Sequence, residues 1–147
     1  MGDIKNYNEA GGFDEYLYYQ DGDILTASNG IQGKVVNDFS EQFLKDEEKT
    51  FHESLPMFSN TSEVYFKRSD EAGHVIEQAR IYINRRATLD LDWGHAHGEH
   101  ELGFVHVHEW RLNKHGKWVR GGNPRKMTEK EIARYGELLL LAYPVKF

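Results

Sequence analysis

Two stretches of the sequence decide the fold: RIYINRRATLDLD at residues 80–92 and VHVHEW at residues 105–110. In both, apolar side chains alternate with polar or ionisable ones, which is the two-residue period of a β-strand that buries one face. The polar segment NRR inside the first stretch is typical of a turn between two strands. Together the stretches predict neighbouring antiparallel strands with one apolar face and one polar face.

The same alternation extends outward over residues 62–112. Turn-forming segments at 70–73 and 94–103 separate the apolar runs. The pattern predicts an antiparallel meander of about four strands. The first 35 residues show no clear period, and their glycines predict irregular structure with a short helix or strand near residues 13–19.

Two capping signals predict helices on either side of the meander. An Asp-x-x-Glu pattern that begins at residue 38 predicts a helix near 39–54, ended by a proline at 56. A Thr-x-x-Glu capping box that begins at residue 128 predicts a second helix near 128–142. The expected fold class is α+β, with the helices packed on one face of the sheet.

The chain of 147 residues has the length of one domain, so residues 1–147 are expected to form a single domain. Its parts are an acidic N-terminal segment (1–56), a β-rich core that carries the His and Asp residues (57–126) and a C-terminal helix (127–143). The acidic segment holds 12 acids and 4 bases, which makes it a candidate surface for a protein partner.

The composition excludes several classes of protein. The absence of cysteine excludes a disulfide scaffold and a thiol nucleophile, so a metal site must be built from His, Asp and Glu. The net charge of −6 argues against a protein that packages nucleic acid. We find no signal peptide pattern at the N-terminus and no apolar run near the ~18 residues of a membrane span. We expect a soluble protein, cytoplasmic at synthesis, with no membrane partner.

One basic run stands out within the second half of the chain. From Arg111 to Lys126 there are six lysines and arginines and no acid. Such a run is a candidate contact for the phosphates of a nucleic acid. The alternative is a solvated loop that keeps the protein soluble.

Histidines concentrate near the second stretch, where six of the eight fall within residues 95–115. Residues two apart in a strand point to the same side, so His106 and His108 share a face, and so do Asp90 and Asp92. If these strands pair, two imidazoles and two carboxylates face each other at ~4.5–5.5 Å between Cβ atoms. Such a face is either wet or functional.

Three interpretations of this polar face stay open. Imidazole nitrogens and carboxylate oxygens are ligands of zinc and manganese, which predicts a divalent metal site formed by His95, His106, His108 and Asp92. Without a metal, the two strand histidines would transfer protons across a phosphodiester. The third interpretation is a polar surface in which the aspartates block pairing at a sheet edge.

Arg80 adds a permanent positive charge beside this face. The bulk of Ile81 and Ile83 favours Arg80 pointing away from the core. A planar guanidinium placed there is expected to pair with Asp92 at rest and with substrate phosphate during a reaction. The candidate catalytic residues are therefore Arg80, Asp90, Asp92, His106 and His108.

Spaced residues across 59–110 resemble a C-terminal module of bacterial polymorphic toxins and of some phage-encoded proteins. That module pairs an arginine-bearing strand with an Asp-x-Asp strand and a His-x-His-x-Trp strand. The resemblance implies a toxin-like domain, often a nuclease, and NRR at 84–86 departs from the glycine turn expected there. The matching positions are Ser59–Ser62, Gly73–Val75, Arg80–Tyr82, Asp90–Asp92, His95 and His106–Trp110. The site implied by the resemblance consists of Arg80, Asp90, Asp92, His95, His106 and His108.

Two classes of function remain. The first is a toxin-like or phage-related small hydrolase, a metal-dependent or histidine acid/base phosphodiesterase that acts as a nuclease. The alternative is a non-catalytic protein-binding module, with a structural metal or none, that uses the tyrosines at 16, 18 and 19. A cleft with open coordination favours the hydrolase, and an apolar patch away from the histidines favours the binding module.

Overall fold

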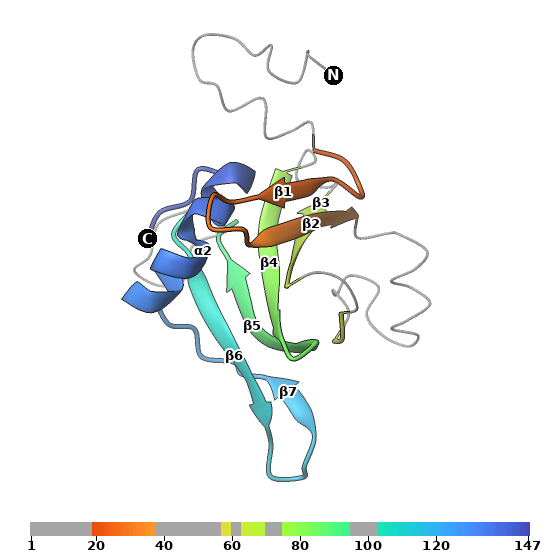
Figure 1. The fold of residues 1–147 in the computed structure, drawn as a ribbon. Helices are drawn as coiled ribbons and strands as arrows, with labels where there is room; N and C mark the ends of the chain where they lie inside the picture. The colour runs from red at the N-terminus through yellow and green to blue at the C-terminus, as the bar shows by residue number, and fades with distance from the viewer. Residues whose placement is uncertain (1–18, 38–56, 60–62, 70–74, 95–102) are drawn as a thin grey trace, which may run out of the picture.

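The structure is a computed structural model that describes residues 19–37, 57–59, 63–69, 75–94 and 103–147. This part of the chain forms one seven-stranded sheet with a C-terminal helix (Figure 1). The elements are β1 (Ile24–Thr26), β2 (Gln32–Asn37), β3 (Val64–Ser69), β4 (Val75–Ile83), β5 (Arg86–Asp92), β6 (His106–Leu112), β7 (Trp118–Arg120) and α2 (Glu129–Ala142).

The strands lie in the sheet in the order in which they occur in the chain. All neighbours are antiparallel except β2 and β3, which are parallel. The prediction of a four-stranded meander with two helices is therefore wrong, because β1, β2 and β7 extend the sheet on both sides. The helix expected at 39–54 lies outside the described residues, as does the element expected near 13–19 except for its last residue.

There are physical reasons why the sequence did not predict these strands. β2 contains Gly33, and a Cβ there would collide with the ring of Phe66 on β3, so this glycine serves close strand packing instead of a turn. β7 is only three residues long and lies inside the basic run, where its charges hide the strand pattern. β2 pairs in parallel with β3, which lies far from it in the chain. The periodicity of a single segment does not predict such a long-range pairing.

The main apolar core lies between the sheet and α2. It contains buried side chains from β2 through β6 and from the helix, and Trp93 is fully buried within it. The Trp93 indole N–H donates to the carbonyl of Ile76 at 2.8 Å, which satisfies its one polar atom. The helix residues in this core are Tyr135, Leu138, Leu139 and Ala142.

Helix α2 begins with the capping box that the sequence predicts. The Thr128 hydroxyl oxygen accepts from the Glu131 N–H at 3.1 Å, and the Glu131 carboxylate accepts from the Thr128 N–H at 2.9 Å. These two bonds satisfy N–H groups that have no partner inside the helix. The position of the C-terminal helix is thus confirmed.

Two hairpins project away from α2 and determine the far end of the molecule (Figure 1). The β4–β5 turn places Asn84 and Arg85 at φ 54° and 68°. Positive φ at both central residues is the type I′ geometry that matches the twist of two antiparallel strands. The β6–β7 turn uses Gly116 at φ 78° and the Asn113 side chain, which accepts from two backbone N–H groups.

Candidate functional site

The predicted polar face exists, on the side of the sheet opposite the main core. Asp90 lies directly opposite His108, and Asp92 lies opposite His106. Arg80 on β4 lies opposite Asp90. The shared face of these five candidate residues is therefore confirmed by the strand register.

Burial excludes the first of the two alternatives for this face, that it is wet. The side chains of Arg80, Asp90, Asp92, His106 and His108 are all buried, and Asp90 is 0 % exposed. A buried carboxylate is costly unless cations and hydrogen bonds compensate it. Its partners must therefore lie within the protein.

Two arginines supply that compensation. Arg80 donates to both oxygens of Asp90, at 2.6 and 3.0 Å. Arg120 on β7 bridges the two aspartates, because it donates to Asp90 at 2.6 Å and to Asp92 at 2.9 Å. The predicted pairing of Arg80 with Asp92 is wrong. Arg80 pairs with Asp90, which lies opposite it, and Asp92 pairs with Arg120 instead. We call Arg80, Asp90, Asp92, His108 and Arg120 the polar network.

The network fixes the charge of its central carboxylate. Burial alone would raise the pKa of Asp90, but the charge of Arg80 and its hydrogen bonds outweigh burial and hold that pKa below its ordinary value. Arg120 and the indole of Trp110 act in the same direction. Asp90 is therefore an ionised structural acceptor at neutral pH and not a carboxylic acid ready to donate a proton.

The two strand histidines contact backbone carbonyls. His108 Nδ1 lies 3.0 Å from the Gly121 oxygen, to which it can donate, and His108 Nε2 lies 3.7 Å from Asp92. His106 Nδ1 lies 3.3 Å from the Asp92 carbonyl oxygen. Among the residues that the structure describes, no three His, Asp or Glu side chains are arranged to hold a metal. His95, the fourth predicted ligand, lies outside these residues.

Aromatic rings enclose the network. The Arg80 guanidinium lies over the Trp110 ring, 4.7 Å from its centroid. Tyr82 and Tyr65 pack edge to face at 5.2 Å in a second apolar cluster with Val36 and Ala87. Burial raises the pKa of Tyr82, so this tyrosine stays neutral. The polar face is thus a closed, charge-balanced layer that joins β4, β5, β6 and β7.

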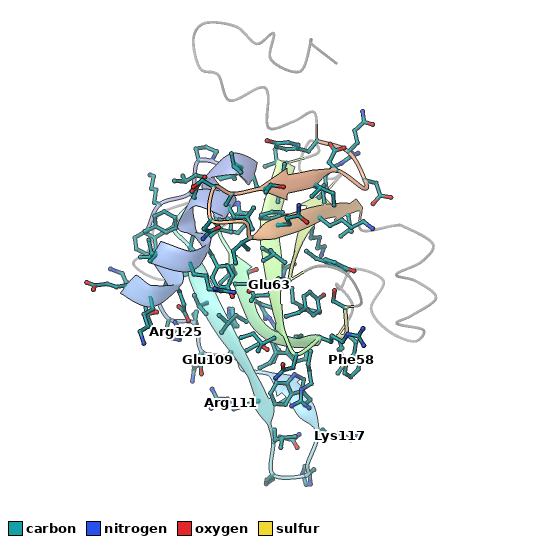
Figure 2. All side chains as sticks on the ribbon, viewed as in Figure 1. Phe58, Glu63, Glu109, Arg111, Lys117 and Arg125 are labelled. Carbon is teal, nitrogen blue, oxygen red and sulfur yellow. The ribbon has the colours of Figure 1, made fainter. Side chains whose placement is uncertain are left out.

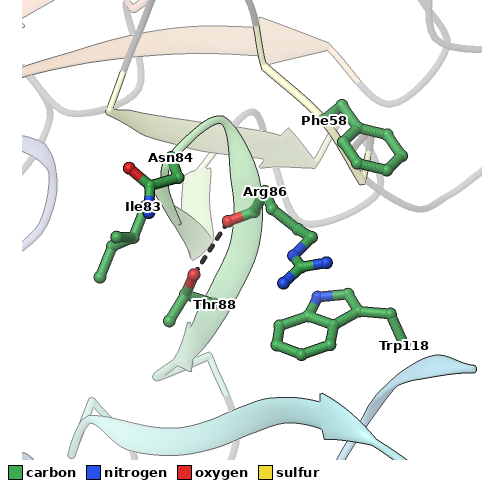
Figure 3. A pocket seen from close by; sticks show the side chains of 6 residues that line it. All are labelled: Phe58, Ile83, Asn84, Arg86, Thr88 and Trp118. Atoms are coloured by element: carbon green, nitrogen blue, oxygen red, sulfur yellow. Dashed lines mark hydrogen bonds between the residues drawn. The ribbon is translucent and has the colours of Figure 1, made fainter. Parts of the chain in front are cut away.

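A different arrangement occupies the far ends of the two hairpins. A depression of about 380 Å³ is lined by side chains from the β4–β5 turn, from β7 and from the segment before β3 (Figure 3). The guanidinium of Arg86 lies 4.1 Å from the Trp118 ring centroid. The lining residues are Phe58, Ile83, Asn84, Arg86, Thr88 and Trp118.

Exposed cations lie on the same two hairpins as this depression. Residues 83–88 and 111–118 contain no Asp or Glu, and Figure 2 shows Arg111 and Lys117 on the hairpin that projects from the sheet. We call Phe58 together with these two segments the hairpin surface. Its exposed cations are Arg85, Arg86, Arg111, Lys114 and Lys117.

The structure divides the predicted basic run into two parts. Arg120 pairs with Asp90 and Asp92, and Arg125 pairs with Glu109 and Glu131. The first half of the run, from Arg111 to Lys117, lies on the projecting hairpin. Sequence reasoning missed the contribution of Arg85, Arg86 and Phe58, although the unusual NRR turn was a signal for the first two.

Comparisons with models of known protein families, with curated proteins and with solved structures find no match. No helix in the described part of the chain is long and apolar enough to cross a membrane.

Proposed function

We propose that this protein binds nucleic acid through the hairpin surface. The observation that supports the proposal is the set of five exposed cations on two adjacent hairpins whose tip segments contain no acid. Phosphates bound by such cations release counterions, which drives association without a need for base-specific contacts. Exposed aromatic and apolar groups beside the cations add a second type of contact.

The two hairpins are held together, so their cations lie at the same end of the molecule. The Trp118 indole N–H donates to the Ala87 carbonyl at 2.7 Å, and Arg86 stacks on the same indole. The Arg86 side chain is exposed, and its guanidinium is oriented by Trp118.

The remainder of the protein favours one orientation of binding. The chain carries a net charge of −6, and α2 presents the exposed Glu129 and Glu137 at a distance from the hairpins (Figure 1). A polyanion is repelled by acidic surfaces and attracted to the basic one. Nucleic acid is thus expected to approach the hairpin surface and to leave α2 uncovered.

Charge reversal tests the proposal. Binding of a fluorescein-labelled oligonucleotide would be measured by anisotropy at several salt concentrations for the parent and for Lys114→Glu with Lys117→Glu. The control is Lys130→Glu, which reverses one exposed lysine on α2 and is compared with each hairpin substitution made singly. We expect affinity to fall at least tenfold in the hairpin variant, with a shallower salt dependence, and to change little in the control. Equal affinity in all three proteins would contradict the proposal.

A phosphodiesterase is the second candidate, and the pair of Asp92 with His108 is the observation that favours it. A carboxylate beside an imidazole can orient a general base. Catalysis at this pair requires the network to open, and Arg120, whose side chain is 36 % exposed, is its most accessible member. Cleavage of labelled RNA and DNA by the parent, lost in His108→Ala and in His106→Ala, would support this candidate.

A divalent metal at the same site remains a prediction with its own test. Zinc or manganese added to chelator-stripped protein should raise the melting temperature by mass action if the folded state presents the ligands together. The rise should disappear in the variant His106→Ala with His108→Ala. No thermal response in the parent would contradict the metal prediction.

A protein partner for the acidic segment 1–56 also remains a prediction. Residues 19–37 are the described portion of that segment, and they form β1 and β2. A truncation that removes residues 1–18 keeps both strands, so it tests partner capture by the preceding residues without removal of part of the sheet.

A further inference from the structure

We propose that the depression between Phe58, Arg86 and Trp118 holds one unpaired base, so that the hairpin surface selects single strands over duplex. This inference rests on the proposed function and names the class of nucleic acid. It adds a base-recognition site to a surface that, by its charges alone, would bind any polyanion.

The residues around the depression suit a flat aromatic ligand. Phe58 is 63 % exposed, an unusual exposure for a phenylalanine, and its backbone pairs with that of Arg86. Figure 3 shows the Arg86 guanidinium between the Phe58 ring and the Trp118 indole. Bases stack on aromatic rings and on guanidinium planes, and each such stack contributes about 1–3 kcal/mol.

The backbone around the depression is fixed before a ligand arrives. The Ala87 N–H donates to the Met57 carbonyl at 2.9 Å, and the Ser59 N–H donates to the Arg85 carbonyl at 3.0 Å. These two bonds hold the segment that carries Phe58 against the β4–β5 hairpin. Trp118 is anchored to the carbonyl of Ala87 from the other side. A preformed site loses less conformational entropy when it binds.

The size and polarity of the depression also fit a base. Its volume of about 380 Å³ lies near the lower end of the ~300–1,000 Å³ typical of small-molecule sites. Asn84 and Thr88 provide polar groups among apolar neighbours.

The charges extend the site along a strand. Arg85 precedes Arg86 in the first hairpin, and Lys117 precedes Trp118 in the second. Because successive side chains along a strand point to opposite faces, Lys117 lies on the other face of its hairpin from Trp118, and Arg86 is the cation that lines the depression. A single strand can place a base in the depression and a neighbouring phosphate on Arg85 or Arg86, whereas a duplex keeps its bases stacked inside.

Four probes of equal length separate base recognition from phosphate binding: oligothymidine, single-stranded RNA of mixed sequence, the corresponding DNA duplex, and an abasic strand that has the phosphates without bases. We expect the parent to bind the two base-bearing single strands about tenfold or more tightly than the abasic strand. We also expect the Trp118 fluorescence to be quenched by oligothymidine and not by the abasic strand.

Two matched variants complete the test. Phe58→Ala removes an exposed ring from the depression, and Leu112→Ala removes an exposed apolar side chain, 59 % exposed, from the same hairpin surface but outside the depression. We expect Phe58→Ala to lose about tenfold in affinity for oligothymidine and nothing for the abasic strand, with Leu112→Ala unchanged. Circular dichroism checks that both variants keep the fold.

The outcomes distinguish the two proposals. If all four probes bind equally and with the same salt dependence, the hairpin surface binds phosphate and the base site is overturned. If Phe58→Ala binds oligothymidine as well as the parent does, the base site is also overturned. If no probe binds at low salt, the proposed function itself fails, and the inference fails with it.

Discussion

The molecule contains two arginines stacked on tryptophans, and their surroundings differ completely. Arg80 lies over Trp110 at 4.7 Å, is buried and donates twice to Asp90. Arg86 lies over Trp118 at 4.1 Å, is exposed and forms no carboxylate pair within the described residues. The same pair of residue types is thus a structural element in one place and a candidate binding element in the other.

The difference shows that burial and charge balance determine what such a pair can do. In the polar network, two arginines are paired with two aspartates. At the hairpin surface, the segments 83–88 and 111–118 carry cations and contain no Asp or Glu. The candidate catalytic residues lie in this buried network, while the exposed cations of the proposed binding surface lie on the two hairpins.

Paired alanine substitutions should show the largest contrast. Arg80→Ala leaves Asp90 buried with one of its two arginines missing, so we expect a loss of about 3–5 kcal/mol in the free energy of unfolding. Arg86→Ala removes an exposed cation–π contact, so we expect a loss of about 0.5–1 kcal/mol. Urea unfolding followed by circular dichroism measures both. Similar losses in the two variants would contradict the division into structural and binding arginines.

The sequence predicted the polar face because strand alternation is a local property. Asp90, Asp92, His106 and His108 follow the two-residue period, and the register Asp90–His108 follows from antiparallel pairing. The C-terminal helix was predictable for a similar reason, since Thr128 and Glu131 form a local capping signal.

The closure of the face could not be predicted, because it depends on a distant residue. Arg120 reaches Asp90 from 30 residues away, and β7, which carries it, is too short to show a period. The sequence interpretation of Asp90 as a candidate catalytic residue therefore did not include its pairing with Arg120. The depression at the hairpin surface likewise joins Phe58 to Trp118, which are far apart in the chain.

Acidification should weaken the polar network specifically. The pKa of Asp90 lies below its ordinary value in the folded state, so the unfolded chain binds this proton at higher pH. The contribution of Asp90 is complete above the unfolded pKa of about 3.9 and is lost as pH falls through the folded pKa. We expect the free energy of unfolding to fall from pH 5 to pH 2, less steeply in Asp90→Asn.

Glu131 has a lowered pKa as well, with Arg125 as the main cause that opposes burial, so it contributes in the same pH window. The variant Glu131→Gln measures how much of the acid dependence of the free energy of unfolding comes from Glu131. If Asp90→Asn folds and shows the same acid dependence as the parent, Asp90 does not carry the effect.

Replacement of the bridging arginine should give a smaller loss. Arg120→Lys keeps the charge but cannot donate to two carboxylates with a planar fork, so we expect a loss of about 1–2 kcal/mol. Arg125→Lys is the matched control, since Arg125 also joins two carboxylates but the Glu109 side chain is 48 % exposed. In thermal unfolding, Arg120→Lys should have a clearly lower melting temperature than Arg125→Lys. The reverse order would show that burial does not set the value of these bridges.

The smallest expected effect is a gain in stability at the hairpin surface. Arg85 holds a left-handed conformation at φ 68°, where glycine is favoured. Arg85→Gly should therefore stabilise the protein by about 0.5–1 kcal/mol, while Arg85→Ala should not. The same glycine variant should bind nucleic acid less tightly, because it lacks one cation. Tighter binding of nucleic acid by Arg85→Gly, or a lower stability, would contradict the idea that Arg85 contributes to binding while it destabilises the turn.

The three tryptophans offer the most direct test, because each reports a different region. Trp93 lies in the main core, Trp110 beside the polar network and Trp118 at the hairpin surface. Their indole N–H signals would be followed by two-dimensional NMR while oligothymidine is added. We expect the Trp118 signal to move, together with the backbone signals of residues 83–88 and 111–118, while those of Trp93 and Trp110 stay in place. Movement of the Trp110 signal with Trp118 unchanged would contradict binding at the hairpin surface and place the ligand at the polar network.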